Sequence, residues 1–208
     1  NNPVGYILMF AIAFGVAFVL TWMFGYKDEV QETAEKNIEA EKKSDAPAEI
    51  AREKTSETGA QTLYSPLEGT AIPLSEVKDA TFASEVLGRG MAVIPSKGEV
   101  KAPCDATVST IFDTKHAIGL ATESGLDLLI HIGVDTVELG GKFYTAHVKD
   151  GDVVKKGQIL ITFDMDAIKA AGYDVTTPLI VTNTDDYEEV KMLAEGTVNN
   201  GSEVLEVK

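Results

Sequence analysis

Short runs of apolar and β-branched residues, separated by Gly, Pro, Asp and Asn, dominate the chain from about residue 59 onward. Runs of this length with such boundaries are typical of β-strands. They predict strands at residues 71–73, 92–94, 107–112, 159–163, 179–182 and 204–207. One short helix is predicted from an Asp166 N-cap to Ala171, with Gly172 as its C-terminal stop. The expected fold class is therefore all-β, an antiparallel sandwich or a partly open barrel.

Two segments of this β region repeat one residue pattern. Ser65-Pro-Leu-Glu-Gly-Thr-Ala71 and Ala102-Pro-Cys-Asp-Ala-Thr-Val108 both read small, Pro, any residue, acid, small, Thr, aliphatic. The repetition favours a duplicated hybrid motif, in which two similar β units pack against each other. Cys104 falls inside the second copy and is interpreted as a small, partly buried side chain rather than a reactive thiol. As the single cysteine, it excludes an internal disulfide and favours a reducing compartment.

The N-terminal part has a different hydropathy pattern. Residues 4–24 contain no charged side chain, and a helix of about 20 apolar residues crosses a bilayer. Tyr6, Trp22 and Tyr26 suit the two interfaces, whereas the basic start and small-residue cleavage site of a secretory signal are missing. We therefore predict a transmembrane helix in residues 1–26 of a longer protein. Residues 27–58, rich in Glu, Lys and Ala, are predicted to be a charged flexible linker before a domain at 59–208.

Charge narrows the classes of partner. The formal net charge of −15 argues against a nucleic-acid surface and favours a basic or charge-complementary partner.

The candidate chemistry lies in one predicted hairpin. Two β-type runs flank the turn residues Glu123-Ser124-Gly125, and each run carries a histidine, His116 before the turn and His131 after it. A two-residue loop at Glu123-Ser124 would place these histidines directly opposite each other, with Cβ atoms about 4.5–5.5 Å apart. Other tight loops shift the pairing by one or two residues. Two of the chain's three histidines therefore meet at one candidate site.

The surroundings of these histidines suggest neutral imidazoles. The run 126–134 is nearly all apolar, and burial favours the uncharged ring, which carries a nucleophilic lone pair on one nitrogen. Thr114 is placed to add a hydroxyl beside His116, and Asp135 is placed to orient an imidazole unless Gly133 bends the strand. Three interpretations remain open at this point: two histidines with no chemical role, a zinc site, or phosphoryl relay between proteins. The zinc hydrolase interpretation uses His116, His131 and Asp135 but lacks the further His-x-His motif, since His147 stands alone.

Beyond these motifs, the domain resembles the glucose-type enzyme IIA domain of the bacterial sugar phosphotransferase system, as carried at the C-terminus of β-glucoside, sucrose and trehalose permeases. The matching stretches are Phe82-Ala-Ser-Glu-Val-Leu-Gly-Arg-Gly-Met-Ala-Val-Ile-Pro95, Val100-Lys-Ala-Pro-Cys-Asp-Ala-Thr-Val108, His116-Ala-Ile118, His131-Ile-Gly-Val-Asp-Thr-Val-Glu-Leu139 and Phe163-Asp164. The apolar N-terminal segment looks like the last helix of an enzyme IIC permease unit.

This resemblance implies a role for each matching residue. His131 would accept a phosphoryl group on Nε2 from the carrier protein HPr, and His116, oriented by Thr114, would help to pass it to a cysteine of enzyme IIB. No cofactor is expected besides this transient phosphohistidine at His131. Asp135 and Asp79 would flank the site. The apolar rim on which HPr and enzyme IIB dock would consist of Phe82, Val86, Phe112 and Leu129.

The resemblance also implies a location and missing parts. The domain would be cytoplasmic and attached to the cell membrane through residues 4–24. Cys104 lacks the Cys-x-Thr-Arg context of enzyme IIB, so that domain and the sugar-binding helices are expected elsewhere. The alternative of a non-catalytic regulatory binding module predicts no uptake of phosphate. Residues 148–160 resemble a hairpin of biotinyl and lipoyl carriers but lack the modified-lysine turn, so we interpret them as shared β architecture.

Overall fold

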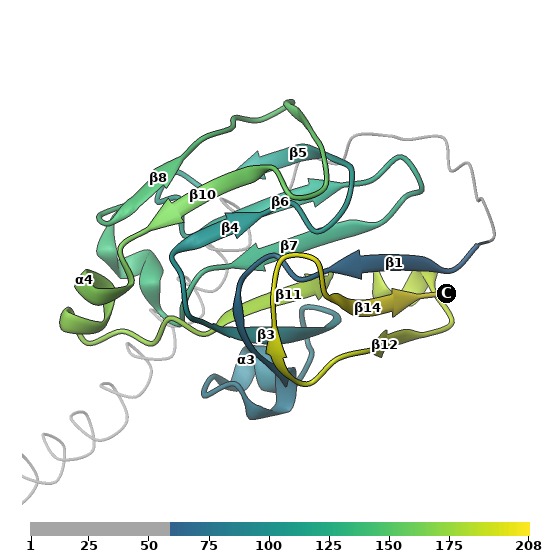
Figure 1. Ribbon diagram of the computed structural model, residues 1–208, viewed down its shortest axis with the longest axis horizontal. Coiled ribbons are helices and arrows are strands. Elements are labelled where there is room, and N and C mark those ends of the chain that lie inside the picture. The colour runs from purple at the N-terminus through teal and green to yellow at the C-terminus, as the bar shows by residue number, and fades with distance from the viewer. Residues whose placement is uncertain (1–58) are drawn as a thin grey trace, which may run out of the picture. The chain divides into compact units, whose positions relative to one another are not determined.

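Strand β7 (Asp127–His131) is paired on one side with β6 (Ala117–Ala121) and on the other with β11 (Thr177–Val181). These strands lie in an eight-stranded sheet of order β13-β2-β3-β11-β7-β6-β5-β9 (Figure 1). The computed structural model describes residues 59–208, so the predicted membrane helix and linker lie outside the described residues. Within residues 59–208, no helix combines the length and hydrophobicity needed to span a bilayer.

Every strand pairing within the described residues is antiparallel, which confirms the predicted all-β antiparallel class. Two three-stranded sheets, β1-β14-β12 and β4-β10-β8, complete the domain. The remaining strands are β1 (Gln61–Tyr64), β2 (Gly69–Pro73), β3 (Arg89–Pro95), β4 (Glu99–Lys101), β5 (Ala106–Ile111), β8 (Tyr144–Ala146), β9 (Val153–Val154), β10 (Ile159–Phe163), β12 (Val190–Met192), β13 (Gly196–Val198) and β14 (Glu203–Val207). The six predicted strands coincide with β2, β3, β5, β10, β11 and β14.

The three sheets share one hydrophobic core. Its buried side chains come from all three, for example Leu63 and Leu205 from one, Leu160 from another, and Ile118 and Ile130 from the largest. Because side chains alternate along a strand, neighbouring residues of the large sheet point to opposite faces. A second, smaller cluster therefore forms on the other face, and it consists of Leu74, Val77, Phe82, Ala92, Val134 and Ile180.

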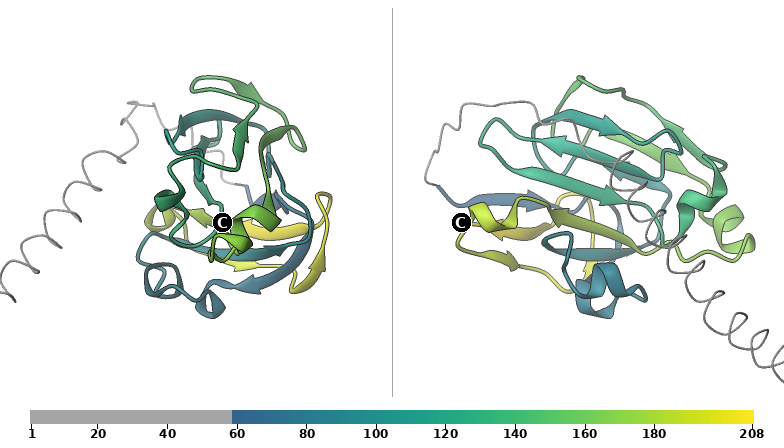
Figure 2. Two further views of the ribbon diagram at one scale, coloured as in Figure 1. Left: turned by 90° about the vertical axis from the view of Figure 1, so that its left-hand side faces the viewer. Right: turned by 180° about the vertical axis from the view of Figure 1, so that it is seen from behind.

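Short helices connect the strands, and two of them cover the smaller cluster on the second face of the large sheet (Figure 2). The helices are η2 (Leu74–Glu76), α3 (Ala80–Ala83), η3 (Thr136–Leu139), α4 (Met165–Ala170) and η4 (Thr184–Asp186). The predicted start of α4 is wrong by two residues, because Asp164 rather than Asp166 is the N-cap. The Asp164 carboxylate accepts a hydrogen bond from the Ala167 backbone N–H at 3.0 Å, and Asp166 lies in the first turn. The predicted stop is confirmed, since Gly172 follows α4 at φ 95°.

The two segments with the repeated pattern contact each other. The backbone N–H of Tyr64 donates to the Pro103 carbonyl at 3.0 Å, and that of Lys101 donates to the Pro66 carbonyl at 2.8 Å. Each segment then continues into a strand of the large sheet, β2 or β5. These reciprocal bonds fit the duplication that the sequence favours.

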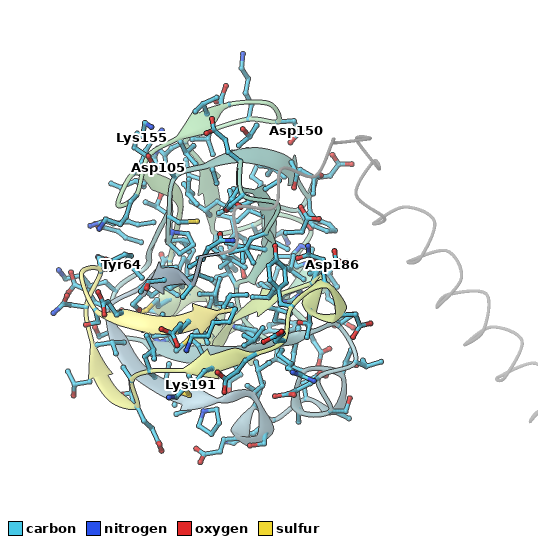
Figure 3. The ribbon with its side chains drawn as sticks, turned by 90° about the vertical axis from the view of Figure 1, so that its right-hand side faces the viewer. Tyr64, Asp105, Asp150, Lys155, Asp186 and Lys191 are labelled. Atoms are coloured by element: carbon cyan, nitrogen blue, oxygen red, sulfur yellow. The ribbon has the colours of Figure 1, made fainter. Side chains whose placement is uncertain are left out.

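Strand β5 is bounded by carboxylates at both of its ends (Figure 3). Before its first residue, Asp105 accepts from the Lys156 backbone N–H at 2.9 Å and forms an ion pair with Lys155. At its last residue, the Ile111 N–H donates to Asp150 Oδ1 at 2.7 Å. The exposed ion pair adds little stability. The Asp150 contact holds the last residue of β5, directly before the turn of residues 112–116.

The corrected N-cap of α4 gives a test. Replacing a capping aspartate with alanine costs about 1 kcal/mol, whereas an aspartate elsewhere in the first turn contributes about half of that or less. We expect Asp164→Ala to lower the free energy of unfolding, measured by urea denaturation, clearly more than Asp166→Ala does. Equal effects of the two substitutions would contradict the cap.

Candidate functional site

The candidate site contains the two predicted histidines, with their rings in contact. The ring centroids of His116 and His131 lie 4.8 Å apart at an interplanar angle of 78°. His131 is the last residue of β7, and His116 comes directly before β6. The predicted meeting of these imidazoles is therefore confirmed.

The register is not that of a two-residue loop, and the pairing is shifted by one residue, as expected for another tight loop. Ala117, not His116, pairs with His131, because the turn closes through Thr122 and Leu126 rather than through a two-residue loop. Adjacent residues of a regular strand point to opposite faces, so this shift alone would separate the rings. They still meet because His116 lies outside the strand and follows Lys115, whose φ is 57°. The irregular turn redirects the His116 side chain toward His131.

The His131 ring is oriented by the backbone that follows it. Its Nδ1 lies 2.8 Å from the Gly133 carbonyl oxygen. Because a carbonyl only accepts, Nδ1 carries the proton and the neutral ring has its lone pair on Nε2. Asp135 was expected to orient an imidazole unless Gly133 bends the strand, and Gly133 does bend it, with φ 84°. Asp135 itself is exposed and takes a left-handed conformation with φ 57°. Sequence reasoning missed the Gly133 carbonyl, although a glycine two residues after a strand histidine signals such a bend.

The His116 ring is buried and held neutral. Only 5% of His116 is exposed, and the Thr114 hydroxyl contacts its Nδ1. Burial, followed by repulsion from His131, lowers the pKa of His116 from 6.5 to about 4. The expected Thr114–His116 contact is therefore present, although Thr114 lies in the turn rather than on the strand.

Of the four apolar residues predicted as a docking rim, two contact the histidines. The Phe82 ring lies 5.0 Å from His131, and the Phe112 ring lies 5.6 Å from His116. Leu129 packs on the smaller hydrophobic cluster that contains Phe82. Val86, on the loop after α3, is 71% exposed. Asp79, predicted as a flanking carboxylate, accepts a hydrogen bond from the Phe82 N–H at 3.0 Å and so caps α3.

Other candidate chemistry lies elsewhere. Within residues 59–208, no group of three or more His, Cys, Asp or Glu side chains is arranged to hold a metal ion. His147 directly follows β8, a strand of another sheet, and its Nε2 lies 2.9 Å from the Thr162 hydroxyl. Burial, with a contribution from the charge of Asp105, raises the pKa of Cys104 to about 12, which agrees with a filling role.

The fold and the site together define an antiparallel β-domain with a centre of two contacting imidazoles, of which the buried His116 is neutral. The family model described as "phosphoenolpyruvate-dependent sugar phosphotransferase system, EIIA 1" matches residues 61–187. The β-glucoside-specific EIIBCA component of Dickeya chrysanthemi is 46% identical over 192 residues, which are 90% of this chain and 29% of that protein. The glucose-specific EIIA component of Oceanobacillus iheyensis is 46% identical over 70% of this chain and 89% of its own length.

A solved structure agrees with these relatives. The glucose permease IIA of Mycoplasma capricolum matches with a TM-score of 0.69 and 33% identity, covering 73% of this chain and 97% of that one. The chain therefore belongs to the EIIA family of the sugar phosphotransferase system, and the resemblance inferred from its motifs is confirmed. It spans only 29% and 21% of the two β-glucoside-specific relatives from Dickeya chrysanthemi and Bacillus subtilis.

The buried neutral imidazole makes stability depend on pH. With the His116 pKa lowered in the folded state, the unfolded chain binds more protons between pH 6.5 and about 4, so stability falls as the pH falls through this range. We expect this residue to remove on the order of 2–3 kcal/mol between about pH 7.5 and pH 4.5. Urea denaturation of wild type and His116→Gln at both pH values measures it, and an equal loss in both proteins would refute it.

Proposed function

We propose that the domain is a phosphoryl carrier that takes a phosphoryl group from the phosphohistidine of HPr onto His131 and passes it to a cysteine of enzyme IIB. The observation that carries the proposal is the contact of His131 Nδ1 with the Gly133 carbonyl, 2.8 Å away, beside a neutral His116. Family membership supports the same chemistry, because the family's description is that of a phosphoenolpyruvate-dependent sugar phosphotransferase system.

In the first transfer, the Nε2 lone pair of His131 attacks phosphorus. A new P–Nε2 bond forms while the P–N bond of phospho-HPr breaks, and the bonding electrons return to the HPr imidazole. The proton on His131 Nδ1 stays in place, donated to the Gly133 carbonyl, and this stabilises the positive charge that develops on the ring. Positioning and charge stabilisation provide most of the catalysis in phosphoryl transfer, so no cofactor enters the proposal.

In the second transfer, His116 acts on the phosphoryl oxygens. The Thr114 hydroxyl engages its Nδ1, so a neutral His116 that accepts this bond carries its proton on Nε2. That N–H donates to a phosphoryl oxygen as negative charge shifts during attack by the enzyme IIB thiolate, while the P–Nε2 bond breaks and a P–S bond forms. The low-dielectric surroundings strengthen this donation. The carboxylates of Asp79 and Asp135 flank the site and favour basic groups on the partners.

The whole protein is proposed to be a membrane permease. The Dickeya relative, named as a β-glucoside-specific EIIBCA component, matches 90% of this chain, so the similarity extends beyond residues 59–208 into the predicted helix and linker. This supports attachment to the cell membrane through residues 4–24, a cytoplasmic position for the domain, and enzyme IIB and IIC units as partners. The relatives' names favour a β-glucoside as the imported sugar.

The two histidines are predicted to differ in their loss-of-function behaviour. We expect His131→Ala to accept no phosphoryl group from radiolabelled phospho-HPr. His116→Ala should still accept it, but transfer to the enzyme IIB cysteine should slow by about 100-fold, the usual effect of losing one charge-stabilising donor.

His147→Ala is the matched control, because this third histidine contacts Thr162 rather than the pair, and both transfers should stay at wild-type rates. An acid-labile label on His131→Ala would rule out His131 as the acceptor. A domain that takes up no label with phospho-HPr present would instead be a binding module.

The docking rim gives a separate prediction. Val86→Ser removes exposed apolar surface beside α3 without touching a reacting group, so the KM for phospho-HPr should rise about fivefold while kcat stays unchanged. Val153→Ser is the control, because Val153 has the same exposure of 71% but lies on edge strand β9. Equal KM values for the two variants would place the docking surface elsewhere.

A further inference from the structure

Two buried hydroxyl groups converge on one backbone carbonyl beneath His131. Thr136 Oγ1, at the start of η3, donates to the Ile132 carbonyl oxygen at 2.6 Å, and the Tyr144 hydroxyl of β8 donates to the same oxygen at 3.3 Å. Thr136 is fully buried and only 5% of Tyr144 is exposed. Burial also raises the pKa of Tyr144, so its hydroxyl stays protonated and able to donate. Ile132 is the residue directly after His131.

The same turn is fixed at two further points. The Ile132 N–H donates to the His116 carbonyl at 2.6 Å, and the Val134 N–H donates to the Asp174 carbonyl at 3.0 Å. The peptide planes on both sides of Gly133 are therefore held by hydrogen bonds. Gly133 itself has φ 84°, and a Cβ there would lie 2.5 Å from Thr136 Cγ2, so the Thr136 side chain also packs against this residue.

Without these contacts the Gly133 carbonyl would be free to rotate, because glycine has the widest choice of backbone conformations. The Gly133 carbonyl is the acceptor for His131 Nδ1, so its direction decides which nitrogen keeps the proton. The Gly133 carbonyl shares its peptide plane with the Val134 N–H, which the Asp174 carbonyl holds. The Thr136 and Tyr144 hydroxyls hold the preceding plane through the Ile132 carbonyl, so both planes that flank Gly133 are fixed and the acceptor cannot turn away.

We propose that Thr136 and Tyr144 are positioning residues for phosphoryl transfer, whose hydroxyls lock the Ile132–Gly133 turn and so hold His131 in the tautomer with its lone pair on Nε2. The expected effect on phosphoryl transfer rests on the proposed function, whereas the effect on the His131 tautomer does not. The two side chains come from η3 and from β8, which belongs to a different sheet from β7, so the nucleophile's tautomer depends on how two sheets pack.

The test uses Thr136→Val, which removes the hydroxyl and keeps the shape, and Tyr144→Phe, which removes the longer bond. Long-range ¹H–¹⁵N spectra of the histidine rings in the folded domain report the tautomer of His131 directly. We expect the ratio of the two tautomers to move toward the Nε2-protonated form by about twofold to tenfold in Thr136→Val and by less in Tyr144→Phe. The rate of phosphoryl acceptance from phospho-HPr should fall in the same order, and Thr136→Ser should restore both readouts.

The matched control is Thr184→Val. Thr184 is also buried and its hydroxyl also donates to a backbone carbonyl at 2.6 Å, that of Val181, in another part of the fold. Its substitution should lower the melting temperature but leave the His131 spectrum unchanged. Identical His131 tautomer ratios in wild type, Thr136→Val and Tyr144→Phe would overturn the inference, and Tyr144→Phe alone decides it if Thr136→Val does not fold. A wild-type domain that accepts no phosphoryl group would defeat the proposed function, while the spectra would still decide the positioning roles.

Discussion

The backbone pairing of β6 with β7 is the constraint on which the site depends. This pairing, together with the 2.6 Å bond from the Ile132 N–H to the His116 carbonyl, brings two histidines 15 positions apart in sequence into contact. The pair lies at the adjoining ends of β6 and β7, which are inner strands of the largest sheet, because β5 and β9 extend one side and β11, β3, β2 and β13 extend the other. Such a position allows little relative movement, because each strand is held on both sides.

Burial determines the protonation state of His116. A histidine in water is half protonated near pH 6.5, and two adjacent imidazolium ions would repel each other. The core removes water from His116, so this ring is neutral although the chain carries a net charge of −15. Thr114 and the Gly133 carbonyl then engage the Nδ1 atom of each ring, and in the proposed transfers the Nε2 atoms act on the phosphoryl group. A phosphoryl carrier needs this combination, because the phosphohistidine must be stable enough to form and labile enough to pass its phosphoryl group on.

The sequence predicted the strand positions and the histidine pair correctly, but not the hairpin register or the N-cap of α4. Six strand positions and the meeting of His116 with His131 follow from apolar runs and a turn signal. The two-residue loop was wrong because the Thr122 hydroxyl closes a longer turn, a contact that no propensity describes. The start of α4 was wrong for a similar reason, since Asp164 and Asp166 are equally good caps in sequence. The residue at which β10 ends decides which of these two carboxylates faces the free backbone N–H groups at the start of α4.

By itself, the sequence determined the all-β class, the histidine pair and the neutral, apolar character of its surroundings, because these depend on residue type and on local spacing. The tertiary structure alone decided that the Gly133 carbonyl contacts His131 Nδ1, and that hydroxyls from η3 and β8 meet beneath it. The physical reason is that a backbone carbonyl is present at every residue and carries no mark in the sequence. Its direction becomes defined only when elements distant in the chain pack together.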